Sequence, residues 1–224
     1  MLAAFGGRKR MSQIVYDYIE DYLNRSLKQN EPFFEELRNF AEKNHIYIVK
    51  PQVEQFLKTF LFAARPSRIL EVGTAIGYSA LMMLSCLPQA HITTIERDEA
   101  VLAMAKENIK KRGAEENIRC IFGDAGEVLE NLNASFDLVF LDAAKGQYQT
   151  HFNLCLAKMN PGGVIITDDV LYMGMTASDK LATKKHITIT RRLREFLSYL
   201  CANERFETTV LPIGDGVAVT YIKE

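Results

Sequence analysis

The stretch that decides the fold is RILEVGTAIGYS, residues 68–79. A short apolar strand runs directly into a turn with glycine at positions 73 and 77, and a helix follows at once. Glycine lets the backbone approach a ligand closely and lets the helix pack against the strand. The spacing E-x-G-x-x-x-G differs from the dinucleotide pattern G-x-G-x-x-G, and Glu71 beside the turn repels a phosphate and attracts a cation. The stretch therefore predicts a cofactor loop for a positively charged ligand.

After residue 68, short apolar strands alternate with helices. We expect strands at 68–72, 91–96, 118–123, 136–142 and 163–167, and helices near 78–86, 99–112, 124–131, 147–158 and 186–202. This alternation predicts a parallel sheet with helices on both faces. Two last strands, 207–211 and 217–222, flank PIGDG at 212–216 and predict a closing hairpin. The fold class is therefore α/β, with a Rossmann-like, seven-stranded, mostly parallel sheet and an antiparallel hairpin at its end.

The chain before residue 68 is predicted to be helical. Apolar residues recur at helical spacing between residues 12 and 62, for example at Val15, Tyr18, Ile19 and Tyr22. We expect these helices to form an N-terminal cap on the sheet, within a single domain that spans residues 12–224. Residues 1–10 are short and basic, lack the apolar core of a signal peptide, and are predicted to be a disordered extension.

The composition excludes several classes of protein. Of 224 residues, 48% are hydrophobic and 25% are charged, which argues against collagen, low-complexity disorder and a disulfide scaffold. No apolar run approaches the roughly 20 residues that a membrane span needs. Four scattered cysteines indicate a reduced, cytoplasmic protein. With 27 basic and 28 acidic residues, the formal net charge is -1, and on that sum alone a nucleic-acid partner is not expected.

Two carboxylates follow the second and third predicted strands. Glu96 lies about 20 residues after the glycine turn, where an acidic residue binds a ribose diol in this architecture. Asp124 follows the third strand at the carboxyl edge of the sheet, where ligands bind. Both suit an adenosine that carries a cationic group, such as S-adenosylmethionine, better than NAD with its two phosphates. The alternative is that Glu96 and Asp124 only cap helices.

Three further carboxylates end the fourth and fifth strands. Because neighbouring parallel strands lie about 4.8 Å apart, Asp142, Asp168 and Asp169 should converge at one edge. Such a group repels itself unless a cation lies among its members, and an all-oxygen donor set suits Mg²⁺, or else Mn²⁺ or Ca²⁺. Lys145 follows closely and could take a proton from a hydroxyl or steady an oxyanion. The alternatives are helix capping by Asp142 and Asp168 and a solvated surface lysine.

These motifs together resemble a known family. They are ILEVGTAIGYS at 69–79, IER at 95–97, GDA at 123–125, LDAAKGQY at 141–148 and GVIITDDVL at 163–171. They are similar to those of the cation-dependent O-methyltransferases, the class I S-adenosylmethionine enzymes of the catechol and caffeoyl-CoA type. Within that family, the stretches HIYI at 45–48, DAAKGQYQ at 142–149 and PIGDGVA at 212–218 look most like the bacterial tRNA 5-hydroxyuridine methyltransferases.

The resemblance implies a function and a set of site residues. The function is methylation of the 5-hydroxyl of 5-hydroxyuridine at the wobble position of the tRNA anticodon loop, giving 5-methoxyuridine, by a homodimer. The implied cofactor-binding residues are Val49, Glu71, Gly73, Ser79, Glu96, Asp124, Ala125 and Asp142. The implied metal ligands are Asp142, Asp168 and Asp169, and the implied catalytic residues are Lys145 and Asp142. The family usually has Asp-Asn where this chain has Asp168-Asp169, so the identity of the third ligand differs. The extra charge should preserve or tighten metal binding and reduce the activating power of the metal.

A basic stretch could bind RNA. Residues 180–194 contain six Lys and Arg and no acidic residue, and Lys184, Lys185, Arg191 and Arg192 are the expected phosphate contacts. Lys50 and residues 8–10 are weaker candidates, and Tyr148 or Tyr172 could stack on a base. The alternative for the stretch is a solvated helix face. The competing functions are O-methylation of a small catechol or phenylpropanoid, and a non-catalytic RNA-binding or cofactor-binding module on the same fold.

Overall fold

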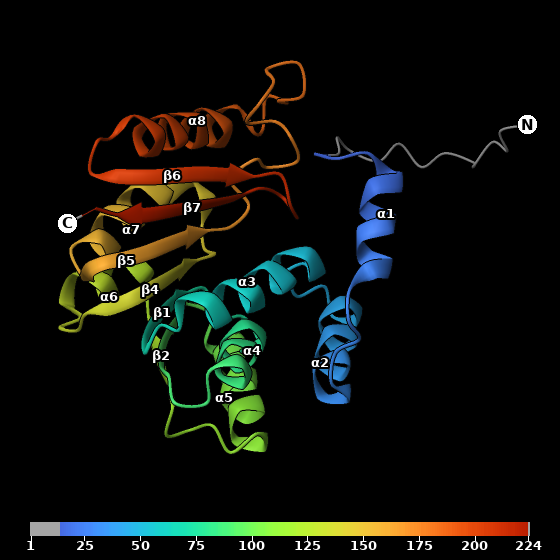
Figure 1. Ribbon diagram of the computed structural model, residues 1–224, viewed down its shortest axis with the longest axis vertical. Coiled ribbons are helices and arrows are strands. Elements are labelled where there is room, and N and C mark those ends of the chain that lie inside the picture. Colours follow the sequence, from blue (N-terminus) through green and yellow to red (C-terminus); the bar gives the residue numbers. More distant parts are fainter. Residues whose placement is uncertain (1–13, 224) are drawn as a thin grey trace, which may run out of the picture.

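The computed structural model describes residues 14–223. The predicted N-terminal extension, with the basic run 8–10, lies outside the described residues. The core is one seven-stranded sheet whose strands lie in the order β3-β2-β1-β4-β5-β7-β6 (Figure 1). The strands are β1 Arg68–Val72, β2 His91–Glu96, β3 Ile118–Phe122, β4 Phe136–Leu141, β5 Met159–Thr167, β6 Phe206–Leu211 and β7 Val217–Ile222. Only β7 runs antiparallel to its neighbours, β5 and β6, so the predicted sheet and hairpin are confirmed.

Six further segments of helix connect these strands. They are α4 Tyr78–Cys86, α5 Glu99–Lys111, α6 Ala125–Asn131, the 3-10 turn η1 Lys145–Gln147, α7 Tyr148–Leu156 and α8 Ile187–Ala202. The main difference from the sequence prediction is β5, which begins at Met159 rather than at residue 163. The stretch NPGG at 160–163 is typical of a turn, yet Met159 pairs with Phe136 of β4 across an irregular register. Tertiary pairing therefore overrides the local turn signal.

The apolar residues of the strands alternate between two hydrophobic clusters. Ile69 of β1 and Phe140 of β4 contribute to the cluster beneath α2, α3, α4 and α5. Leu70 and Val72 of β1 belong to the opposite cluster, beneath α6, α7 and α8. Because successive side chains of a strand point to opposite faces, this alternation places helices on both faces, as predicted.

The N-terminal helices are α1 Asp17–Ser26, α2 Pro32–Lys43 and α3 Pro51–Ala64. Helices α2 and α3 bury Phe34, Leu37, Val53 and Leu57 and pack on α4, which confirms a cap for this part. Helix α1 differs from that expectation because it buries no residue and stands away from the sheet beyond α3 (Figure 1). Its Tyr18 and Tyr22 are exposed, and within residues 14–223 its main packing partner is α3. No helix among residues 14–223 is long and apolar enough to span a membrane.

The topology places the ligand-binding edge. Strands β1 and β4 are neighbours, but their connections run to opposite sides, with β2 and β3 on one side and β5 on the other. In open α/β sheets, such a switch point opens a crevice at the carboxyl ends of the strands. The loops after Val72 and Leu141 meet there, where the Asp142 amide donates to the Val72 carbonyl at 2.9 Å.

Candidate active site

Two cavities adjoin at the carboxyl ends of β1, β2 and β4. The first has a volume of about 380 Å³ and lies over the glycine turn and the starts of α5 and α6. The second has a volume of about 570 Å³ and lies toward β5 and the hairpin loop. Residues on the shared wall line both cavities: Tyr47, Gly73, Ala75, Glu96, Asp142 and Ala143. The geometry thus provides two neighbouring compartments that meet at Asp142.

The glycine turn brings the backbone of β1 against that of β4. Gly73 has φ +108°, and a Cβ built on it would lie 2.0 Å from the carbonyl oxygen of Asp142. No side chain fits in that space, so the close approach requires glycine. Gly77, at φ +79°, precedes the first residue of α4, where any Cβ would press on Ala105 of α5. The sequence prediction of a tight strand–turn–helix is confirmed.

Backbone amides hold the carboxylates of the first cavity. Glu96 accepts from the amides of Ala75, Arg97 and Asp98 at 2.9–3.0 Å, and therefore binds the glycine turn to the end of β2. Asp124 caps α6 by accepting from the Gly126 amide at 2.9 Å. Asp124 and Glu96 also line the first cavity, so the capping and the ligand-facing interpretations of Asp124 are both compatible with its position.

The other predicted cofactor residues occupy different positions. Gly73 and Ala125 line the first cavity, whereas Glu71 and Ser79 are buried behind the glycine turn and line neither cavity. Burial raises the pKa of Glu71 to about 7, although the hydroxyls of Ser79 and Thr94 act in the opposite direction. Val49 is also buried in the hydrophobic core, and its neighbours in the chain line the cavities instead.

The second cavity contains the predicted acidic group. Asp142, Asp168, Asp169 and Lys145 all line it, so the structure confirms that these residues share one edge. Lys145 Nζ lies 2.7 Å from Asp169 Oδ2, and Asp168 Oδ1 accepts from the Asp169 amide at 2.7 Å. Burial and the neighbouring Asp169 charge raise the pKa of Asp142 to about 6. Burial, Asp142 and Asp169 likewise raise the pKa of Asp168.

Among residues 14–223, no three Asp, Glu, His or Cys side chains are arranged closely enough to form a finished metal site. The donor chemistry nevertheless fits a divalent cation. All candidate ligands are oxygen atoms, as Mg²⁺, Mn²⁺ and Ca²⁺ prefer, and the buried carboxylates repel one another. Asp169 adopts a left-handed conformation with φ +58°, which Asn and Asp tolerate best among non-glycine residues.

The structure also brings Tyr47 and Asp215 to the cavities, neither of which was predicted as a site residue, together with Lys50, which was expected only as a weaker RNA contact. Tyr47, which is 94% exposed, lies on the wall shared by both cavities, and Lys50 lines the second cavity. Asp215, from the loop between β6 and β7, enters the second cavity and accepts from the Met173 amide at 2.5 Å. In the sequence, the pattern that indicates Asp215 is its position between two glycines in PIGDG. Gly214 packs on Val53 with no room for a side chain, so the loop that contains Asp215 lies against α3.

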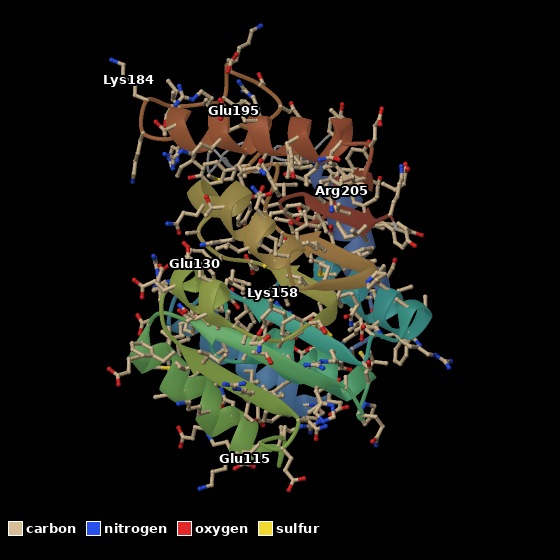
Figure 2. All side chains as sticks on the ribbon, turned by 90° about the vertical axis from the view of Figure 1, so that its left-hand side faces the viewer. Glu115, Glu130, Lys158, Lys184, Glu195 and Arg205 are labelled. Atoms are coloured by element: carbon tan, nitrogen blue, oxygen red, sulfur yellow. The ribbon has the colours of Figure 1, made fainter. Side chains whose placement is uncertain are left out.

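The basic stretch divides into paired and unpaired residues. Arg191 pairs with Glu195, Arg194 pairs with Asp179, and Arg192 donates to the Gly146 carbonyl at 3.0 Å. Lys184 and Lys185 are exposed ahead of α8, and Figure 2 shows Lys184 pointing away from the body of the protein.

The two tyrosines considered for base stacking also differ. Tyr148 is buried in the core, where it donates to the Asp168 carbonyl at 2.9 Å, and cannot stack on a base in this conformation. Tyr172 lines the second cavity, and its hydroxyl lies 2.6 Å from His186 Nδ1.

Comparisons with known proteins agree with this geometry. A family model described as O-methyltransferase matches residues 24–223. A catechol O-methyltransferase of Niastella koreensis is 28% identical over 95% of this chain and 100% of its own length. A candidate caffeoyl-CoA O-methyltransferase from Staphylococcus aureus has a structure with a TM-score of 0.82 and 32% identity, covering 92% of this chain and 97% of its own. The structure of a Podospora anserina methyltransferase with bound S-adenosylhomocysteine has a TM-score of 0.84 over both full chains and, at 24% identity, supports the fold alone.

Proposed function

The chain belongs to the O-methyltransferase family and is an S-adenosylmethionine-dependent enzyme, and on that premise we propose that it methylates a hydroxyl of a small phenolic acceptor with the aid of a divalent cation. The observation that carries the proposal is the junction of the two cavities at Asp142. One compartment suits the adenosine of the methyl donor, the other contains carboxylates and a lysine, and the two share a wall that includes Gly73, Ala75 and Asp142. This arrangement allows a donor and an acceptor to approach each other.

In the first cavity, the chain supplies negative charge and close backbone contact. Glu96 and Asp124 offer carboxylate oxygens where a ribose diol binds in this fold. Asp142 adds a negative charge at the junction, which favours a cationic donor over one with phosphates. S-adenosylmethionine supplies a methyl group on a positively charged sulfur, which a hydroxyl oxygen can attack.

In the second cavity, Asp142, Asp168 and Asp169 would hold the divalent cation. Such a cation supplies Lewis acidity, which lowers the pKa of an acceptor hydroxyl. Lys145 contributes a positive charge of its own. Burial acts to lower its pKa, but the charge of Asp169 and the other aspartates outweighs burial and raises the pKa. Lys145 is therefore an ammonium group beside the carboxylates and is suited to stabilise negative charge on the acceptor oxygen.

The size and character of the second cavity favour a small acceptor. A volume of about 570 Å³ lies within the roughly 300–1,000 Å³ of sites that enclose small molecules. The N. koreensis relative is a catechol O-methyltransferase, and this chain matches it over its full length. Catechols and phenylpropanoids with adjacent oxygens are accordingly the first substrates to test.

One observation favours a second acceptor, the 5-hydroxyuridine of a tRNA anticodon loop. Lys50 is exposed and lines the second cavity, and phosphate groups bind such lysines. Lys184 and Lys185 are exposed directly before His186, whose ring contacts Tyr172 of that cavity. Tyr47 offers an exposed ring for stacking at the cavity wall. The pairing of Arg194 with Asp179 weakens this interpretation, because that charge is already compensated.

The deciding experiment compares both acceptors with one purified protein. Radiolabelled methyl transfer is measured with a catechol, with caffeoyl-CoA and with tRNA, each with and without added Mg²⁺. The variant K184E/K185E is compared with K110E/K111E, which reverses two exposed lysines at the end of α5 outside both cavities. We expect transfer to the small phenols and no specific effect of K184E/K185E.

The tRNA alternative has the opposite signature. It requires transfer to tRNA that K184E/K185E abolishes and K110E/K111E preserves. Nucleoside mass spectrometry would then show 5-methoxyuridine in the tRNA of cells that have the gene and 5-hydroxyuridine in its place in cells that lack the gene. Transfer to none of the acceptors would contradict both proposals.

A further inference from the structure

The chain between α2 and α3 forms a wall of both cavities. Ile46 and Tyr47 line the first cavity, and Tyr47, Ile48 and Lys50 line the second. These residues form neither helix nor strand. The position of both ligands therefore depends on how this irregular segment, residues 46–50, is held.

Hydrogen bonds fix the two ends of the segment. The Ile46 amide donates to the Ala41 carbonyl at 2.9 Å, and the Lys50 carbonyl accepts from the Glu54 amide at 2.8 Å. In the part of the chain that the structure describes, one hydrogen bond reaches the backbone between these ends. Arg38 Nη1 donates it to the Val49 carbonyl at 3.1 Å. The conformation of the middle of the segment thus depends on one side chain of α2.

Buried polar contacts hold Arg38 itself. Its Nη2 donates to Glu54 Oε2 at 2.6 Å and to the Tyr78 hydroxyl at 3.0 Å. The guanidinium also lies 4.7 Å from the centre of the Tyr78 ring. Glu54 is 2% exposed and pairs with Lys58 at 2.7 Å as well. Arginine suits this position because its planar group can donate in several fixed directions at once.

The same network reaches the start of α4, directly after the glycine turn. Tyr78 is the first residue of α4 and directly follows Gly77, the last residue of the glycine turn. Its hydroxyl also donates to Glu54 Oε2 at 2.8 Å. Arg38 therefore connects the backbone of residues 46–50 with the start of α4, although Arg38 lines neither cavity.

We propose that Arg38 is a positioning residue for cofactor binding, which acts by fixing residues 46–50 against the start of α4 through the Val49 carbonyl and the Tyr78 hydroxyl. The inference rests on the proposed use of the first cavity for S-adenosylmethionine. The inference gives the network of Arg38, Glu54 and Tyr78 a role in ligand binding in addition to a role in stability. A conservative substitution of Arg38 distinguishes the two roles, because only the first predicts a change in cofactor affinity.

The test compares R38K with R112K. Lysine keeps a positive charge near Glu54 but cannot reach Glu54, Tyr78 and Val49 together. Arg112 is a matched control, because its guanidinium lies 4.9 Å from the Phe33 ring and pairs with Glu31, without contact to residues 46–50. For R38K, we expect the Kd of S-adenosylhomocysteine, measured by calorimetry, to rise about tenfold, as the loss of one charged hydrogen bond implies. Amide exchange at residues 46–50 of the ligand-free protein should accelerate, whereas R112K should change neither quantity.

The proposal is refuted if R38K folds with a lower Tm but keeps the wild-type Kd for S-adenosylhomocysteine and the wild-type amide exchange at residues 46–50. If R38K does not fold, Y78F decides the question. This variant keeps the ring under the guanidinium and removes the hydroxyl, and it should show the same two changes to a smaller extent. Unchanged values in Y78F would equally refute the proposal. Because neither readout uses an acceptor, failure here is distinct from an error in the proposed substrate.

Discussion

In the first cavity, the carboxylate of Glu96 accepts hydrogen bonds from three backbone amides. In the second cavity, Asp142, Asp168 and Asp169 lie near one another with the ammonium of Lys145 as the positive charge beside Asp169. Amides stabilise the Glu96 charge without any ligand, whereas burial and mutual repulsion raise the pKa values of Asp142 and Asp168. Backbone amides thus hold the carboxylate of the first cavity in place before a ligand binds. The second cavity has an excess of negative charge that a bound cation would neutralise.

This difference should separate the effects of substitutions. Changes to the second cavity should lower the rate of methyl transfer more than the affinity for the cofactor. Changes to the first cavity should do the reverse. Experiments that measure both quantities for each variant therefore test the comparison directly.

The largest effect is expected for D142A. It removes a proposed metal ligand but leaves the backbone carbonyl against which Gly73 packs. We expect kcat to fall at least about a thousandfold, since several kcal/mol of charge stabilisation disappear. The Kd of S-adenosylhomocysteine should change by less than about tenfold, because Glu96 and its amide contacts remain. Radiolabelled methyl transfer and calorimetry measure the two values, and normal methylation by D142A would refute the metal-assisted mechanism.

A smaller loss of rate is expected for K145M, which keeps the length of the side chain and removes its charge. Without the ammonium, negative charge on the acceptor oxygen is less stabilised, and kcat should fall about a hundredfold. The matched control is K158M, a half-buried lysine that donates to the Leu132 carbonyl outside both cavities. Steady-state kinetics distinguish the two variants. Equal kcat values in K145M and the wild type would remove Lys145 from the mechanism.

In the first cavity, E96Q should weaken cofactor binding. A neutral amide is a poorer acceptor for the three backbone N–H groups, so we expect the Kd of S-adenosylhomocysteine to rise about tenfold. With saturating cofactor, kcat should stay within about threefold of the wild-type value, since Glu96 acts mainly in binding. The neighbouring E99Q, in the exposed first turn of α5, is the control. A large loss of kcat with unchanged Kd would contradict the proposed separation of the cavities.

The last prediction concerns the pH dependence of stability and leaves the activity of the two cavities aside. Burial raises the pKa of Glu71 to about 7 from an ordinary value of 4.5, so the folded state retains a proton that the unfolded state releases. The contribution of Glu71 to stability therefore falls as pH rises from about 4.5 to about 7 and is constant above that range. The wild type should lose up to about 3 kcal/mol relative to E71Q over this range. Urea unfolding of both proteins at several pH values measures the difference, and parallel pH profiles would refute it.

The sequence predicted much of the fold because most of its signals are local. The apolar run 68–72, the glycines at 73 and 77, and carboxylates directly after strands each report on neighbouring residues in the chain. Parallel pairing then requires the ends of β1, β4 and β5 to meet, so the shared edge of Asp142, Asp168 and Asp169 could be predicted. The start of β5 could not, because its pairing with β4 outweighs the local turn preference of residues 160–163.

Other features depend on contacts between distant parts of the chain. Asp215 enters the second cavity because the hairpin loop packs on α3, and Tyr47 lies on the shared wall because Arg38 holds the segment that contains it. The periodic apolar residues of α1 predicted a helix correctly but not its exposure, since periodicity does not show which surface lies opposite.

The sequence by itself therefore determined the order of strands and helices, the glycine turn and the acidic strand ends. Each of these follows from local steric and hydrophobic preferences. Only the tertiary structure decided which charges are compensated: Arg194 of the basic stretch meets Asp179, whereas Asp142 and Asp168 are buried with too little positive charge nearby. The physical reason is that electrostatic energy depends on distance and burial in space, neither of which a linear count of charges contains.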